Sequence, residues 1–110
     1  GGQLIKDNLS TASPMAKEYF NNMNFELAVI SASAFTPSNG FSCNSQIEAD
    51  LLKLVCSKAK AVYMMLDSSK IGKIMPYTFA HIEDINVLIT DQYFPDEMRT
   101  VFQQNDIVVM

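Results

Sequence analysis

The chain of 110 residues contains no tryptophan, two cysteines, one histidine and only eight basic residues. Twelve acidic residues give a formal net charge of −4, and the basic residues are scattered without forming a cluster. Affinity for DNA depends on neutralising phosphates with Lys and Arg, so this chain by itself is a poor nucleic-acid binder. It also lacks the ~20 consecutive apolar residues that span a bilayer, and it shows no secretory signal.

The scarce cysteine and histidine residues predict neither a metal site nor a cofactor. Cys43 and Cys56 do not belong to a CxxC motif or a Cys/His cluster, so we expect no zinc. Two cysteines are enough to form one disulfide, so a disulfide is one interpretation. Two reduced cysteines, Cys43 in a loop and Cys56 on a helix, are the simpler interpretation. His81 has no obvious partner in the sequence, and we assign it no function.

Apolar residues make up 48% of the chain, which predicts one globular domain with one core. Apolar runs predict buried strands over residues 25–33, 61–66, 85–90 and 107–110. One helix is predicted over residues 14–21. A second is predicted to begin at the capping box formed by Ser45 and Glu48, and a third to begin at Pro95. Residues 71–82 are expected to form an irregular loop with a short strand or helical turn, because Pro76 interrupts regular structure. The alternation predicts an α/β fold with a mostly parallel sheet flanked by helices.

Two of the predicted strands end in an aspartate, at Asp67 and Asp91. Ligands of open α/β sheets bind just outside the carboxyl ends of the strands, where both aspartates are expected to lie. Asp67 is followed by Ser68, Ser69 and Lys70, two hydroxyls and a cation that suit a phosphate or another anion. The alternative for this segment is a capped turn with a solvated lysine, and for Asp91 a turn residue that closes the strand.

These motifs resemble the effector-sensing domain of DeoR-type transcription regulators. Residues 66–72, LDSSKIG, are similar to that family's L-x-D-S-S-K-F/I-G segment, and residues 84–91, DINVLITD, to its D-I-D-x-L-I-T-D segment. Gly1 and Gly2 match the paired glycines that open this half of the domain, and Glu48-Ala49 its helical E-A motif. The resemblance covers essentially the whole chain.

The resemblance implies the fold of ribose-5-phosphate isomerases and CoA transferases, used as a non-enzymatic, cytoplasmic and usually oligomeric sensor. The implied ligand is a phosphorylated sugar or a related metabolite, bound by Asp67, Ser68, Ser69, Lys70, Asp91, Gly1 and Gly2. The implied partner is DNA, contacted through an N-terminal winged helix-turn-helix that this chain lacks. The chain is therefore expected to be a single partial sensor domain, incomplete on its N-terminal side.

Several positions depart from the family pattern. Ser13, Ser31 and Ala34 stand where the family usually has glycine, and Leu52 where it usually has a basic residue. Because an added Cβ narrows a backbone cradle, these departures imply either an unusual ligand or a degenerate pocket.

Two alternative functions follow from the same fold. One is a sugar-phosphate isomerase or deaminase with Asp67 or Asp91 as its base, and the other is an oligomerisation module.

Overall fold

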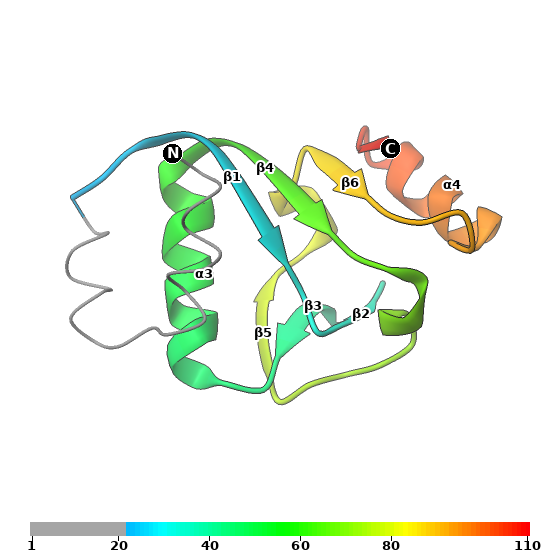
Figure 1. Cartoon of the computed structure of the whole chain (residues 1–110), viewed down its shortest axis with the longest axis horizontal. Coiled ribbons are helices and arrows are strands. Elements are labelled where there is room, and N and C mark those ends of the chain that lie inside the picture. Colours follow the sequence, from blue (N-terminus) through cyan, green and yellow to red (C-terminus); the bar gives the residue numbers. More distant parts are fainter. Residues whose placement is uncertain (1–21) are drawn as a thin grey trace.

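The computed structural model describes residues 22–110, in which two β-sheets pack with two α-helices (Figure 1). Sheet A is entirely parallel and has the order β1-β4-β6-β7. Its strands are β1 (Phe25–Ser31), β4 (Ala59–Met65), β6 (Val87–Ile89) and β7 (Val108–Val109). The structure thus confirms the predicted α/β class with a mostly parallel sheet. The predicted helix over residues 14–21 lies outside the described residues.

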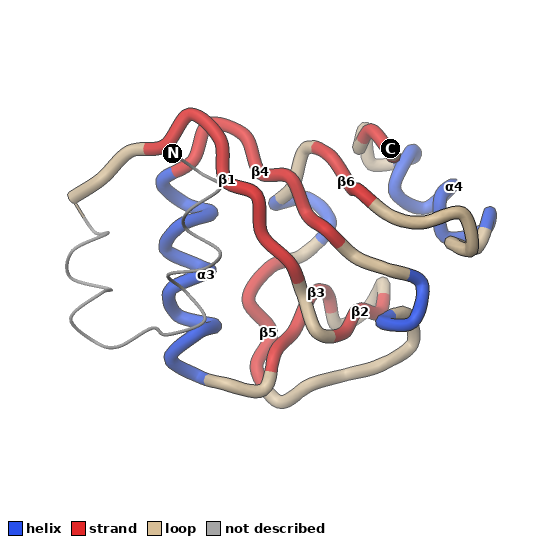
Figure 2. The backbone as a smooth tube through the Cα atoms, viewed as in Figure 1, coloured by secondary structure: helices blue, strands red, loops and turns tan. Residues whose placement is uncertain are grey.

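A second, antiparallel sheet is the main feature that the sequence did not reveal (Figure 2). Sheet B has the order β2-β3-β5, built from β2 (Ala34–Thr36), β3 (Gly40–Cys43) and β5 (Tyr77–Ala80). The prediction that Cys43 lies in a loop was wrong, because Cys43 is buried on β3. The predicted first strand ends two residues early, at Ser31, and the backbone N–H of Ser33 already bonds Ser42 O of sheet B at 3.0 Å.

Helix α3 (Gln46–Lys58) follows β3 of sheet B, leads into β4 of sheet A, and contacts β1, β3, β4 and β5. The predicted cap is present, since the Ser45 side chain accepts the backbone N–H of Glu48 at 3.3 Å. Its buried residues are Ala49, Leu51, Leu52 and Val55. Ile47, which the helical pattern places on the apolar face, is 45% exposed.

Helix α4 (Asp96–Gln104) begins after Pro95, as the sequence predicts, and leads to β7. Its buried residue is Phe102, whose ring lies 5.3 Å from Phe35 and 6.0 Å from Phe94 between centroids. Phe35 in turn lies 4.6 Å from Phe41. This phenylalanine cluster joins α4 to sheet B and forms the centre of the core. Within residues 22–110, no helix has the length and apolar character needed to cross a membrane.

Two short 3₁₀ helices lie next to strands of sheet A. The short 3₁₀ helix η1 (Ser68–Lys70) follows β4, and a second, η2 (Ile82–Asp84), precedes β6. The chain after η1 returns to sheet B, where Gly72 donates its N–H to Phe35 O at 2.8 Å. After α4 the chain passes through Asn105, with φ −99°, to Asp106, which has a left-handed backbone with φ 61°.

Candidate functional site

A pocket of ≈ 410 Å³ lies at the carboxyl ends of β1, β4 and β6. Its lining comes from the last residues of these neighbouring parallel strands and from the segments that follow them: Ser31, Met65, Leu66, Asp67, Lys70, Ile89, Thr90 and Asp91. The position agrees with the rule that open α/β sheets bind ligands outside the carboxyl ends of their strands. We refer to this cavity as the strand-end pocket.

Three of the predicted site residues, Asp67, Lys70 and Asp91, line the strand-end pocket. Ser68 lies beside them and bonds to Asp91, whereas Ser69 is exposed and bonds to Asp67. Gly1 and Gly2 lie outside the described residues.

Asp67 caps the turn that follows β4. Its Oδ1 accepts the backbone N–H of Ser69 at 2.9 Å and also the Ser69 hydroxyl. The hydrogen bond from the Ser69 hydroxyl is the largest cause that lowers the pKa of Asp67 below its ordinary 3.8. The carboxylate therefore stays ionised at neutral pH.

Asp91 connects the ends of β4 and β6. Its Oδ2 accepts the backbone N–H of Ser68 at 3.0 Å and the Ser68 hydroxyl at 3.2 Å. Its Oδ1 accepts the backbone N–H of Tyr93 at 2.9 Å. These bonds, led by the Ser68 N–H, lower the pKa of Asp91, and the Arg99 guanidinium adds to the effect. Asp91 thus fixes the Asp67–Lys70 turn against the end of β6.

Arg99 supports this arrangement from helix α4. Its Nη2 donates to the backbone oxygen of Asp91 at 3.2 Å, and its guanidinium carbon lies 5.7 Å from the centre of the Phe94 ring. Because Phe94 is buried in the phenylalanine cluster, the core positions Arg99 and thereby the segment after β6.

The donors predicted to hold an anion are largely used within the protein. The N–H and hydroxyl of Ser68 bond to Asp91, and those of Ser69 bond to Asp67. In contrast, Lys70 forms no ion pair among residues 22–110, where the recorded pair joins Lys60 and Glu26 on the surface. The Lys70 charge helps to lower the pKa of Asp67 without forming an ion pair with it, and Lys70 is the cation of the described pocket lining.

Thr90 is a pocket residue that sequence reasoning did not select, and Ser31, which also lines the pocket, was named only as a departure from the family's glycine. The Thr90 hydroxyl oxygen is buried and has no hydrogen-bond partner in the described part of the chain. A buried hydroxyl without a partner is costly, which makes Thr90 a candidate ligand contact. The sequence did contain a signal for Thr90, because Thr90 directly precedes Asp91 in the LITD segment. Ser31 is placed in the pocket by strand pairing alone.

Comparison with known proteins identifies the family. The model of the DeoR C terminal sensor domain matches residues 1–92, which include the whole strand-end pocket. The chain belongs to this sensor-domain family. The matched region ends before α4 and β7, so Arg99 and Phe102 lie outside it.

Curated relatives of this sensor domain are transcription regulators. The chain is 26% identical over its whole length to the HTH-type transcriptional regulator GlpR of Haloferax volcanii, covering 43% of that protein. It is 30% identical over 84 residues to the regulator IolR of Bacillus subtilis, covering 76% of this chain and 34% of IolR. It is 22% identical over 97 residues to the L-fucose operon activator of Haemophilus influenzae, covering 88% of this chain and 39% of that activator.

These relatives assign the domain to regulators and not to enzymes, as the sequence predicted. The chain spans less than half the length of each of them.

Proposed function

We propose that this chain is the metabolite-sensing part of a DeoR-family transcription regulator and that the strand-end pocket binds a phosphorylated sugar. The main support for this proposal is that Asp67, Lys70 and Asp91 line one cavity, in a chain that belongs to a sensor-domain family. The proposed full-length protein binds DNA through an N-terminal winged helix-turn-helix and acts as a homo-oligomer. In this view residues 1–110 are one partial sensor domain.

The hydrogen bonds in the pocket indicate a different role in ligand binding for each residue. Asp67 and Asp91 are ionised acceptors, so they suit the hydroxyl groups of a sugar and repel a phosphate. The Thr90 hydroxyl adds a further partner for a sugar hydroxyl. Lys70 supplies the cation for the phosphate, because the Ser68 and Ser69 donors already bond to carboxylates. The name of the L-fucose operon activator, a similar protein, supports a carbohydrate-related ligand.

A ligand would regulate DNA binding by binding one conformation of the protein better than another. Asp91 is the proposed connection, since it bonds the turn after β4 to the segment after β6. A ligand that contacts Asp67 and Thr90 together would bias the relative positions of these two strand ends.

The test is thermal unfolding of the full-length regulator with a panel of sugar phosphates, paired with fluorescence anisotropy on its own promoter DNA. A ligand that binds only the folded protein raises the melting temperature once its concentration exceeds Kd. Lys70→Ala is expected to weaken the active compound about tenfold or more, because a charge-assisted hydrogen bond is lost.

Lys73→Ala is the matched control, because Lys73 is exposed, three residues away and outside the pocket lining. It should bind the compound like the wild type. The proposal fails if no sugar phosphate shifts the melting temperature or changes DNA binding. Stable self-association without any ligand response would instead support the oligomerisation module, and turnover of a sugar phosphate would support the isomerase alternative.

A further inference from the structure

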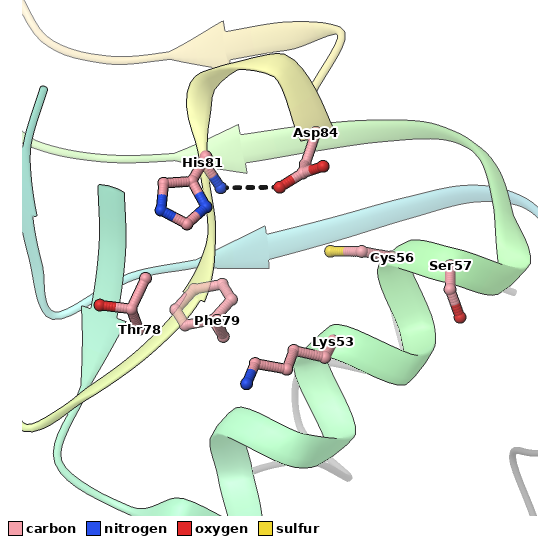
Figure 3. A pocket seen from close by; sticks show the side chains of 7 residues that line it. All are labelled: Lys53, Cys56, Ser57, Thr78, Phe79, His81 and Asp84. Atoms are coloured by element: carbon pink, nitrogen blue, oxygen red, sulfur yellow. Dashed lines mark hydrogen bonds between the residues drawn. The ribbon is translucent and has the colours of Figure 1, made fainter. Parts of the chain in front are cut away.

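A second pocket, of ≈ 460 Å³, lies near the opposite end of sheet A (Figure 3). It is lined by the C-terminal half of α3, by β5 and by η2. Helix α3 runs directly into the start of β4, and η2 ends just before β6 begins. The strand-end pocket lies at the other ends of these strands. The two cavities therefore lie toward opposite ends of β4.

The polar groups of the second pocket stand on different walls. Figure 3 shows Lys53 on α3 at one side of the pocket and Asp84 on η2 at another. Lys53 forms no ion pair within residues 22–110. The Asp84 carboxylate is held in place, because its Oδ2 accepts the backbone N–H of His81 at 2.8 Å. The pocket thus offers a cation and a positioned acceptor to the same ligand.

The base of the pocket is apolar. Phe79 is only 4% exposed and lines the pocket together with Cys56 (Figure 3). Burial, followed by the charge of Asp84, raises the pKa of Cys56 to about 12. The thiol therefore stays protonated at neutral pH. No group of His, Cys, Asp and Glu suited to a metal occurs in the described part of the chain. These features favour an organic ligand.

The His81 wall of the pocket packs against sheet B. Gly40 has φ +81°, and a Cβ placed on it would lie 2.9 Å from Cδ2 of His81 and 2.4 Å from Ala80 O. The imidazole therefore packs directly against the β3 backbone. Such a pre-formed wall lowers the ordering cost of binding, and the volume falls within the range of small-molecule sites.

We propose that the cavity between α3, β5 and η2 is a second ligand site, which binds a small hydroxylated anion. Lys53 holds the oxyanion, Asp84 accepts a hydroxyl, and the carbon skeleton lies on Phe79. The oxyanion is a phosphate or a carboxylate, since both have the same chemistry toward a lysine ammonium. Thr78 adds a hydroxyl to the same wall as Phe79.

The test is isothermal titration calorimetry of the full-length regulator carrying Lys70→Ala, which weakens the strand-end pocket. D-glucose 6-phosphate and D-gluconate are the probes, because each has one oxyanion and several hydroxyls. At least one probe is expected to bind. Adding Lys53→Ala should weaken that probe about tenfold or more, and adding Asp84→Asn should weaken it severalfold.

Lys58→Ala is the matched control, because Lys58 lies on the same helix and does not line the pocket. It should leave the affinity unchanged, and all variants should unfold at similar urea concentrations. Binding of glucose 6-phosphate alone would show that the site takes a phosphate, and binding of gluconate alone would show that it takes a carboxylate. The proposal is overturned if neither probe binds at millimolar concentration, or if Lys53→Ala and Lys58→Ala bind equally well. Every titration uses the Lys70→Ala protein. The comparison of Lys53→Ala with Lys58→Ala therefore tests the second pocket whether or not the strand-end pocket binds a sugar phosphate.

Discussion

At the scale of single residues, the carboxylates of the strand-end pocket have a structural role that limits their role in binding. Both oxygens of Asp91 accept protein hydrogen bonds, and Oδ1 of Asp67 accepts two from Ser69. The sequence left two interpretations open for each residue, capping or ligand contact. The hydrogen bonds show the capping role, and ligand contact stays a prediction for the strand-end pocket.

The Asp91 interactions predict a specific pH dependence. The pKa of Asp91 is lowered in the folded protein, so its contribution to stability is present above the ordinary pKa of 3.8 and is lost as pH falls through the lower folded value. Asp91→Asn should lower the urea midpoint at pH 7 and reduce its further fall below about pH 4. Urea unfolding of both proteins between pH 7 and pH 3 checks this. Equal pH profiles would show that the bonds from Ser68 and Tyr93 contribute nothing.

At the scale of elements, the local pattern predicts long elements better than short ones. The Ser45 cap and the apolar spacing of α3 define a helix of 13 residues. The strands β2 and β3 have only three and four residues, so alternation cannot separate them from a loop. The loop predicted from the composition of residues 36–40 is confined to Pro37, Ser38 and Asn39, because Thr36 ends β2 and Gly40 begins β3. Only pairing with β5, far along the chain, makes their neighbours a sheet.

The start of β3 provides a test with a matched control. Gly40 and Gly72 both have positive φ, +81° and +84°, but a Cβ on Gly40 would meet Ala80 O at 2.4 Å while one on Gly72 meets nothing within 4 Å. Gly72→Ala should cost about 1 kcal/mol from backbone strain alone. Gly40→Ala should cost at least about 2 kcal/mol more, because the strand or its neighbour must move. Urea unfolding measures both, and similar costs would contradict the close packing of β3 on β5.

At the scale of the whole molecule, residues beyond the matched family region complete the core. Phe102 of α4 is fully buried and contacts Phe35, Phe41 and Phe94. Phe35 and Phe41 belong to sheet B, and Phe94 precedes α4. The same cluster supports Arg99, which bonds the segment that carries Asp91. Helix α4 is thus linked to the strand-end pocket through the core.

Truncation of Phe102 tests this link. Phe102→Ala should lower the free energy of unfolding by about 3–5 kcal/mol, because it leaves a cavity among three aromatic rings. Phe102→Leu keeps much of the volume and should cost clearly less. Denaturant unfolding gives both values. A cost below about 1 kcal/mol for Phe102→Ala would mean that α4 does not contribute to the core as the structure shows.

The sequence by itself determined the parallel strands, the two helices and the place of Asp67 and Asp91, because apolar runs and caps are local signals. The family motifs, which are also local, predicted the sensor-domain assignment. Tertiary structure decided the rest. The bond from Ser68 to Asp91 joins residues 23 positions apart, so no local pattern reveals that the expected anion donors are used internally. The pocket between Lys53 and Asp84 likewise forms because β5, which leads into η2, packs on α3. Such contacts depend on how elements pack in space, and this is information that spacing along the chain does not contain.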